Sequence, residues 1–202
     1  MGSAEQRINV AAMRLFGERG TFDLTMSELA AEAGVARGTL YRTVDSMEQL
    51  FERVRDTLAI EVHATIARTM DAHGALDPPL RLATGLRMLV RLAHDHPPMG
   101  RFAVRFGLTE ESLREMLSGP PMHDIRAGLV AGRYDLPTGS ELNIAAMLMG
   151  TTVSAMWTVL EGRQTWREAG SKAAELVLRA MGVPPEEARQ ISVEPLPPMP
   201  RP

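Results

Sequence analysis

The residues best suited to chemistry lie near the N-terminus, in the stretch TMSELAAEAGVARGTLYR that runs from Thr25 to Arg42. Hydroxyl groups and helix N-termini hold phosphate oxygens, and an arginine can donate two hydrogen bonds to O6 and N7 of guanine. The positions that we expect to be exposed near the end of this stretch are Arg37, Gly38, Thr39, Tyr41, Arg42 and Thr43. The segment therefore indicates contact with a nucleic acid.

Groups that would support catalysis or metal binding are scattered. The sequence has no cysteine, Gly-x-Ser-x-Gly elbow, phosphate-binding loop or His-Glu-x-x-His motif. His94 and His96 are two positions apart, which on a helix directs them about 200° apart, so we expect no shared metal. We predict no catalytic residue, no metal and no cofactor. An enzyme, which would need clustered titratable groups in the second half, is the rival hypothesis from another class.

Proline divides the 202 residues into an N-terminal part without proline and a later part with proline pairs at 78–79, 97–98, 120–121 and 184–185. Because proline suits the first turn of a helix and breaks its interior, the pairs mark successive helices. No stretch shows sustained period-two alternation. The sequence therefore predicts an all-α fold with two domains and a tail. These are a helix-turn-helix domain over 4–50 whose fourth helix continues to about 72, a helical effector-binding and dimerisation domain over 73–190, and a proline-rich, extended or disordered tail over 191–202.

Capping signals place the helices of the first domain. After a first helix, Thr25 begins the second, with Glu28 in capping-box spacing, and Gly34 ends it. The third helix covers 37–44, and the fourth begins at Asp45. Two short helices joined by a three-residue turn form a helix-turn-helix, whose second helix can enter the major groove of DNA.

The order of these parts closely resembles the DNA-binding domain of TetR-family transcriptional regulators over about residues 4–60. The matching residues, at the spacing of that family, are Thr25, Leu29, Ala30, Ala33, Gly34, Val35, Gly38, Thr39, Leu40, Tyr41 and Leu50. The resemblance implies a sequence-specific regulator of double-stranded operator DNA, most simply a repressor, that forms a homodimer and responds to a small-molecule effector in the cytoplasm.

The same resemblance implies roles for individual residues. Thr25 would present a helix N-terminus to phosphate, Thr39 and Tyr41 would hold phosphates, Arg37 and Arg42 would contact phosphates or bases, and Gly38 would allow close approach of the DNA backbone.

The sequence departs from the family pattern at Thr43, Val44 and Met47, where a basic or imidazole residue, an aromatic residue and a lysine are common. Residues 1–72 carry 8 Arg against 11 Asp and Glu, and DNA-binding proteins more often have a basic footprint. A dimeric helical ligand-binding or interaction module with weak or no DNA binding is therefore the alternative.

The second half supplies methionine-rich apolar helix faces, which suit adaptable pockets but also ordinary core packing. The resemblance places the effector site in this region. The predicted pocket residues are Met88, Leu92, Phe102, Phe106, Met122, Met147 and Thr151. We expect an apolar or cationic-amphipathic effector, and helix four as the lever that carries its effect to the DNA-binding domain.

Residues 142–160 contain no charged side chain. Several hydroxyl and amide groups make this segment too polar for a convincing membrane span, and no leader sequence follows the start, so we expect no membrane association. A helix that is apolar all round is buried on both sides, and the next helix offers small residues for close approach. The predicted dimer interface contains Met149, Val153, Met156, Gly170, Ala173 and Val177.

Overall fold

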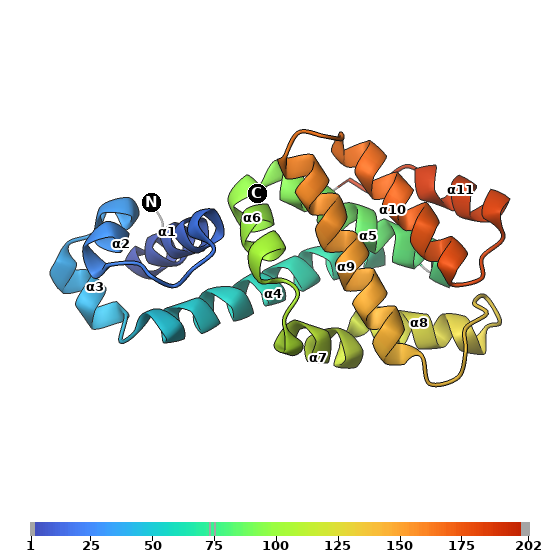
Figure 1. The fold of residues 1–202 in the computed structure, drawn as a ribbon, viewed down its shortest axis with the longest axis horizontal. Coiled ribbons are helices and arrows are strands. Elements are labelled where there is room, and N and C mark those ends of the chain that lie inside the picture. The colour runs from blue at the N-terminus through green and yellow to red at the C-terminus, as the bar shows by residue number, and fades with distance from the viewer. Residues whose placement is uncertain (1–2, 73, 75, 199–202) are drawn as a thin grey trace.

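The computed structural model describes residues 3–72, 74 and 76–198. Within these residues the chain forms helices and no strand, which confirms the all-α prediction. The helices are α1 (Ala4–Arg19), α2 (Met26–Ala33), α3 (Arg37–Thr43), α4 (Met47–Asp71), α5 (Pro78–Asp95), α6 (Pro97–Phe106), α7 (Glu110–Ser118), α8 (Pro120–Val130), α9 (Glu141–Leu160), α10 (Trp166–Ala180) and α11 (Pro185–Val193). Figure 1 shows α1–α3 grouped at one end, joined by the long α4 to a larger body that contains α5–α11.

Local sequence explains most helix boundaries. Pro78, Pro97, Pro120 and Pro185 each stand at the first position of a helix, where the missing N–H has no intrahelical partner to lose. The cap of the fourth helix lies one residue later than Asp45, the cap that the sequence predicts. The observed cap is Ser46, whose hydroxyl accepts a hydrogen bond from the amide of Gln49 at 3.2 Å, so the helix begins after this residue and not at Asp45.

The C-terminal boundary also lies later than the sequence predicts. Helix α11 continues to Val193, and the buried Arg87 of α5 donates from Nη1 to the carbonyl oxygen of Glu194 at 2.6 Å. A guanidinium at the negative end of a helix stabilises that end. The first residues assigned to the tail therefore belong to the helical body, and 199–202 lie outside the described residues.

The described residues form two apolar cores, and the second domain contributes to the core of the first domain. Residues of α1–α4 pack around the fully buried Ile8, Phe16 and Leu40, and Phe102 of α6 joins them. Helix α6 lies beside α1 (Figure 1). A Cβ atom at Gly17 would lie 2.8 Å from the backbone nitrogen of Phe102, so glycine is what allows this close approach.

Helix α9 lies in the larger body, against α5, α6, α7 and α10. Among the described helices, it is the one that is long and apolar enough to cross a membrane, with a mean hydropathy of 1.3. A core helix of a soluble domain meets the same criteria, and α9 packs against four neighbouring helices.

Candidate functional site

The exposed surface of α3 is the candidate nucleic-acid interface. The helix is anchored by the fully buried Leu40, and Val44, just after its last residue, is also buried. Arg37, Gly38 and Arg42 are exposed, and the Tyr41 side chain is 63% exposed. Predicted contact residues therefore stand on the outer surface of the helix-turn-helix.

The two threonines of α3 are half-buried and differ in the hydrogen bonds that they can offer. The Thr43 hydroxyl donates to the carbonyl oxygen of Thr39 at 2.9 Å, so its proton is already used within the helix. The Thr39 hydroxyl accepts a hydrogen bond from Arg42 at 3.4 Å and keeps its own proton. Of the two, Thr39 is the better candidate for a phosphate contact, and the geometry gives Thr43 a local role.

The N-terminus of α2 is occupied by an acidic side chain. Thr25 and Glu28 form a reciprocal capping box, in which the Thr25 hydroxyl donates to the Glu28 carboxylate at 2.7 Å and accepts from its backbone amide at 3.2 Å. The Arg19 guanidinium and the two donors of Thr25 lower the pKa of Glu28 to about 2. A DNA phosphate at this N-terminus would meet a carboxylate, which weakens the predicted role of Thr25.

Arg53 of α4 holds the end of α3 in place, a role that no sequence pattern indicates. Its Nε donates to Asn9 of α1 at 3.2 Å, and its Nη1 donates to the carbonyl oxygen of Thr43 at 3.2 Å. Arg53 thus links three helices at the C-terminal end of the candidate DNA-reading helix. Its Nη2 is buried without a hydrogen-bond partner among the described residues.

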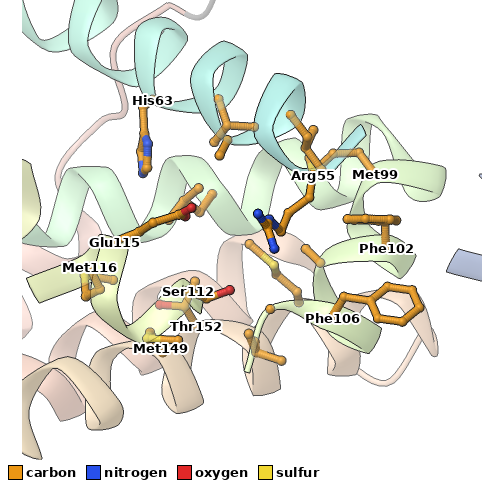
Figure 2. Close-up of a pocket in the computed structure, with 18 of the residues that line it drawn as sticks. Arg55, His63, Met99, Phe102, Phe106, Ser112, Glu115, Met116, Met149 and Thr152 are labelled. Atoms are coloured by element: carbon orange, nitrogen blue, oxygen red, sulfur yellow. The ribbon is translucent and has the colours of Figure 1, made fainter. Parts of the chain in front are cut away.

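A cavity of about 220 Å³ lies between α4, α6, α7 and α9. Figure 2 shows its side chains converging from these helices. Apolar groups make up most of the lining, and its polar side chains are Arg55, His63, Ser112, Glu115 and Thr152. A second lobe of about 130 Å³ shares His63, Leu89, Met116, Pro121 and Thr152 with the first and extends towards Arg81 and Asp124. This arrangement suits a small, mostly apolar ligand with a few polar groups.

The structure places two of the predicted pocket residues, Phe102 and Phe106, in the lining of this cavity. The other five do not line either lobe. Met88 and Met122 are fully buried, Leu92 and Thr151 are half-buried, and Met147 borders a separate surface groove beside the α8–α9 loop. The predicted residues lie on α5, α6, α8 and α9, most of them point away from the cavity, and the walls that α4 and α7 supply were not predicted.

The predicted dimer residues also need correction. Met149, Val153 and Met156 line the 220 Å³ cavity. Gly170, Ala173 and Val177 are buried, in the helix α10 that packs against α5, and Gly170 lies beside Arg87. Small residues do permit close helix approach here, but within one protomer.

All five phenylalanines of the chain form one cluster between the cavity and the first domain. Phe106, which lines the cavity, lies 5.8 Å from Phe22 and 4.9 Å from Phe51 between ring centroids. Phe51 also contacts Phe16 of α1 at 5.5 Å and Phe102 at 5.4 Å. The cavity wall is therefore connected to α1 by directly packed rings.

Comparison with known proteins agrees with this architecture. Residues 8–54 match the model of bacterial regulatory proteins of the tetR family, and residues 77–194 match a tetracyclin repressor-like C-terminal domain. An uncharacterised HTH-type transcriptional regulator of Mycobacterium tuberculosis is 34% identical over 100 residues, which are 48% of this chain and 46% of that protein. The chain thus spans about half the length of the curated relatives it matches.

Two solved structures share the fold over nearly the whole chain. RolR in complex with the ligand resorcinol is 24% identical with a TM-score of 0.68, and the match covers 97% of this chain and 96% of RolR. A TetR-family regulator from Shewanella sp. PV-4, described as putative, is 21% identical with a TM-score of 0.74, over 89% of this chain and 98% of that one.

Proposed function

Because the chain belongs to the TetR family of bacterial regulatory proteins, we propose that it is a homodimeric, cytoplasmic repressor that binds a specific DNA operator and leaves it when a small molecule fills the cavity. The observation that carries this proposal is the exposed polar surface of α3 on a firmly anchored helix-turn-helix. Its action is binding, without catalysis.

DNA binding is tested by selecting operator fragments from a random pool and measuring their affinity by fluorescence anisotropy at several salt concentrations. Arg42→Ala should cost about 1 to 3 kcal/mol if this side chain reads a base, and Tyr41→Phe should weaken binding to all sequences. Arg126→Ala is the matched control, because Arg126 is an exposed arginine on α8 in the other domain. Operator affinity that is equal in all three folded variants would contradict the assignment of α3.

The exposed surface of α9 and α10 is the proposed dimer interface, in place of the buried residues that the sequence predicted. Trp157 and Leu176 are 44% and 63% exposed, and Gly150 has open space beside its Cα. Pairing this surface about a two-fold axis would form a four-helix interface. Leu176→Glu should therefore shift the mass measured by light scattering towards the monomer, whereas Val130→Glu, at the 91% exposed end of α8, should leave the mass unchanged.

Effector release would use both α4 and α6, because both line the cavity and both contribute rings to the phenylalanine cluster. The lever expected for α4 is thus accompanied by a direct contact of α6 with α1. Resorcinol, the ligand of RolR, is a reasonable first probe. If a ligand lowers the affinity of the protein for the operator, linkage requires that the operator lower the affinity for the ligand by the same factor. Equal ligand affinity with and without operator would rule out coupling.

A dimeric ligand-binding module with weak DNA binding is the second candidate, and the Glu28 carboxylate at the N-terminus of α2 is the observation that favours it. This candidate predicts ligand binding in the cavity with no sequence enriched from the random DNA pool.

A further inference from the structure

Two side chains of opposite charge line the effector cavity, and they differ in the hydrogen bonds that they form. The cavity-lining side chains include one guanidinium, that of Arg55, and one carboxylate, that of Glu115. The state of hydrogen bonding of these two groups determines which of them is available to a ligand.

Arg55 is already matched by two neighbouring carboxylates. Its Nε and Nη2 donate to Asp56 at 3.1 and 2.9 Å, and Nη2 also donates to Glu52 at 2.9 Å. Burial lowers the pKa of Arg55, but these carboxylates and Glu115 outweigh that effect and raise it. A ligand carboxylate at Arg55 would have to compete with groups that already satisfy the cation.

Glu115 is in the opposite situation. It is half-buried on α7, on the same side of the helix as Ser112 and Met116, which also line the cavity. Its carboxylate accepts no hydrogen bond and forms no ion pair within 4.0 Å among the residues that the structure describes. Its charge does act on Arg55 from a distance. Figure 2 shows Glu115 and Arg55 extending into the cavity from different helices.

A partly desolvated carboxylate that accepts no hydrogen bond is stabilised most by a ligand that supplies a hydrogen-bond donor. Withdrawing an unpaired charge from water is costly, and a charge-assisted hydrogen bond is roughly twice as strong as a neutral one. Glu52 and Asp56 lie outside the cavity lining and pair with Arg55, so the group that these three residues form with Glu115 carries three carboxylates and one guanidinium and is net negative. This field attracts cations and repels anions.

We propose that the effector is a cationic amphiphile, whose ammonium group donates a hydrogen bond to Glu115 and whose apolar part lies against Phe102, Phe106 and the methionines of the cavity. The proposal rests on the proposed function, because it concerns the same cavity. It identifies Glu115 as the group that selects ligands by charge, and it explains why an apolar cavity retains a carboxylate without a partner. The second lobe provides room for a longer apolar chain.

The test uses three probes with the same phenylpropyl skeleton: 3-phenylpropylamine, 3-phenylpropan-1-ol and 3-phenylpropionate. Their affinities for the 202-residue chain are measured by calorimetry without DNA, at neutral pH and constant ionic strength. The amine should bind about ten-fold more tightly than the alcohol, which corresponds to about 1.4 kcal/mol, and the carboxylate should bind most weakly.

Two variants assign the preference to Glu115. In Glu115→Gln the advantage of the amine over the alcohol should disappear, while the alcohol keeps its affinity. Glu110→Gln is the control, because Glu110 is on the same helix but is 88% exposed in its side chain and pairs with Arg114 outside the cavity. The control should bind all three probes as the unchanged protein does.

The ligand-binding results test the class of effector, and they can be distinguished from the results that test operator release. Equal affinity for amine and alcohol, tighter binding of the carboxylate, an unchanged amine preference in Glu115→Gln, or no binding of any probe would each overturn the assignment of a cationic effector. Release of operator DNA is measured separately with the amine. If the amine binds with the expected preference but operator binding is unaffected, the ligand class stands and the regulatory coupling fails.

Discussion

Replacing Gly17 by alanine tests whether the contact between α1 and α6 sets the position of the DNA-binding domain. The added Cβ would lie 2.8 Å from the nitrogen and 3.2 Å from the Cα of Phe102. Optimal contacts between such atoms are about 3.5 to 4.0 Å, so the helices must separate by roughly 0.5 Å or more. Because both atoms belong to the backbone of α6, a rotamer change cannot remove the clash.

The energetic effect can be separated into two parts. Alanine in place of a helical glycine contributes about 0.5 to 1 kcal/mol to helix stability, and this gain is the same with and without DNA. Overpacking at the α1–α6 contact costs about 1 to 3 kcal/mol, but a free protein can relieve it by moving its DNA-binding domain. DNA fixes two half-sites about 34 to 36 Å apart, so the bound dimer cannot do so. We expect Gly17→Ala to lose about 5- to 150-fold in operator affinity, with little loss in the free energy of unfolding.

The assay combines operator titration by fluorescence anisotropy with urea unfolding of the same preparation. Gly170→Ala on α10 is the matched control, because its Cβ would lie 3.5 Å from the Cα of Arg87, an ordinary van der Waals distance, and because Gly170 lines neither lobe of the cavity. That variant should keep its operator affinity. If Gly17→Ala, folded and dimeric, binds the operator within two-fold of the unchanged protein, the α1–α6 contact does not position the DNA-binding domain.

Three other substitutions have expected outcomes. Arg53→Met should reduce operator affinity several-fold, because α3 loses its link to α1 and α4. Arg53→Lys should restore little of this affinity, since one ammonium group cannot reach both acceptors. Full operator affinity in Arg53→Met would contradict the positioning role of Arg53. Arg87→Met should lower the free energy of unfolding in urea by about 1 to 3 kcal/mol, since the carbonyl of Glu194 loses a buried charged donor, and unchanged stability would contradict this. The ionised Glu28 stabilises the fold above its ordinary pKa of 4.5, and this contribution disappears as the pH falls towards about 2. Glu28→Gln should therefore flatten the pH dependence of stability in that range, and an identical acid profile for both proteins would refute the capping interaction.

The sequence predicted local structure well because its signals act over a few residues. The Thr25–Glu28 capping box is present, and Gly34 adopts the left-handed conformation expected at the end of α2. The prediction of Asp45 as the cap of α4 was wrong, because the adjacent Ser46 caps this helix. Neighbouring residues with similar capping ability cannot be ranked by spacing alone.

The orientation of side chains in the second domain could not be read from the sequence in the same way. Helix α9 is apolar nearly all round, so its periodicity does not show which side faces the cavity. Met149 and Met156 were consequently assigned to the dimer interface, and Thr151 was chosen instead of the adjacent Thr152. A shift of one residue turns a helical side chain by about 100°, which is enough to exchange cavity and surface.

Contacts between distant residues account for the features that the sequence did not indicate. Arg53 meets Asn9 across 44 positions of the chain, and neither residue type nor spacing reveals that pair. The phenylalanine cluster is similar, because Phe22 lies in the loop between α1 and α2, outside any helical pattern.

The phenylalanine cluster also changes how a cavity ligand would act on the DNA-binding domain. A long α4 alone could transmit a shift as a rigid lever, but the same cavity wall includes Phe106 of α6, which packs against Phe22 and Phe51. A ligand that displaces this ring must disturb α6 and α4 together, because closely packed rings leave no free volume to absorb the movement. The absence of a side chain at Gly17 brings the backbones of α1 and α6 into direct contact, so that displacement reaches the DNA-binding domain over a short path as well as along α4. Because the two routes start from one cavity, a ligand that binds one shape of the cavity more tightly than the other acts through both routes at once.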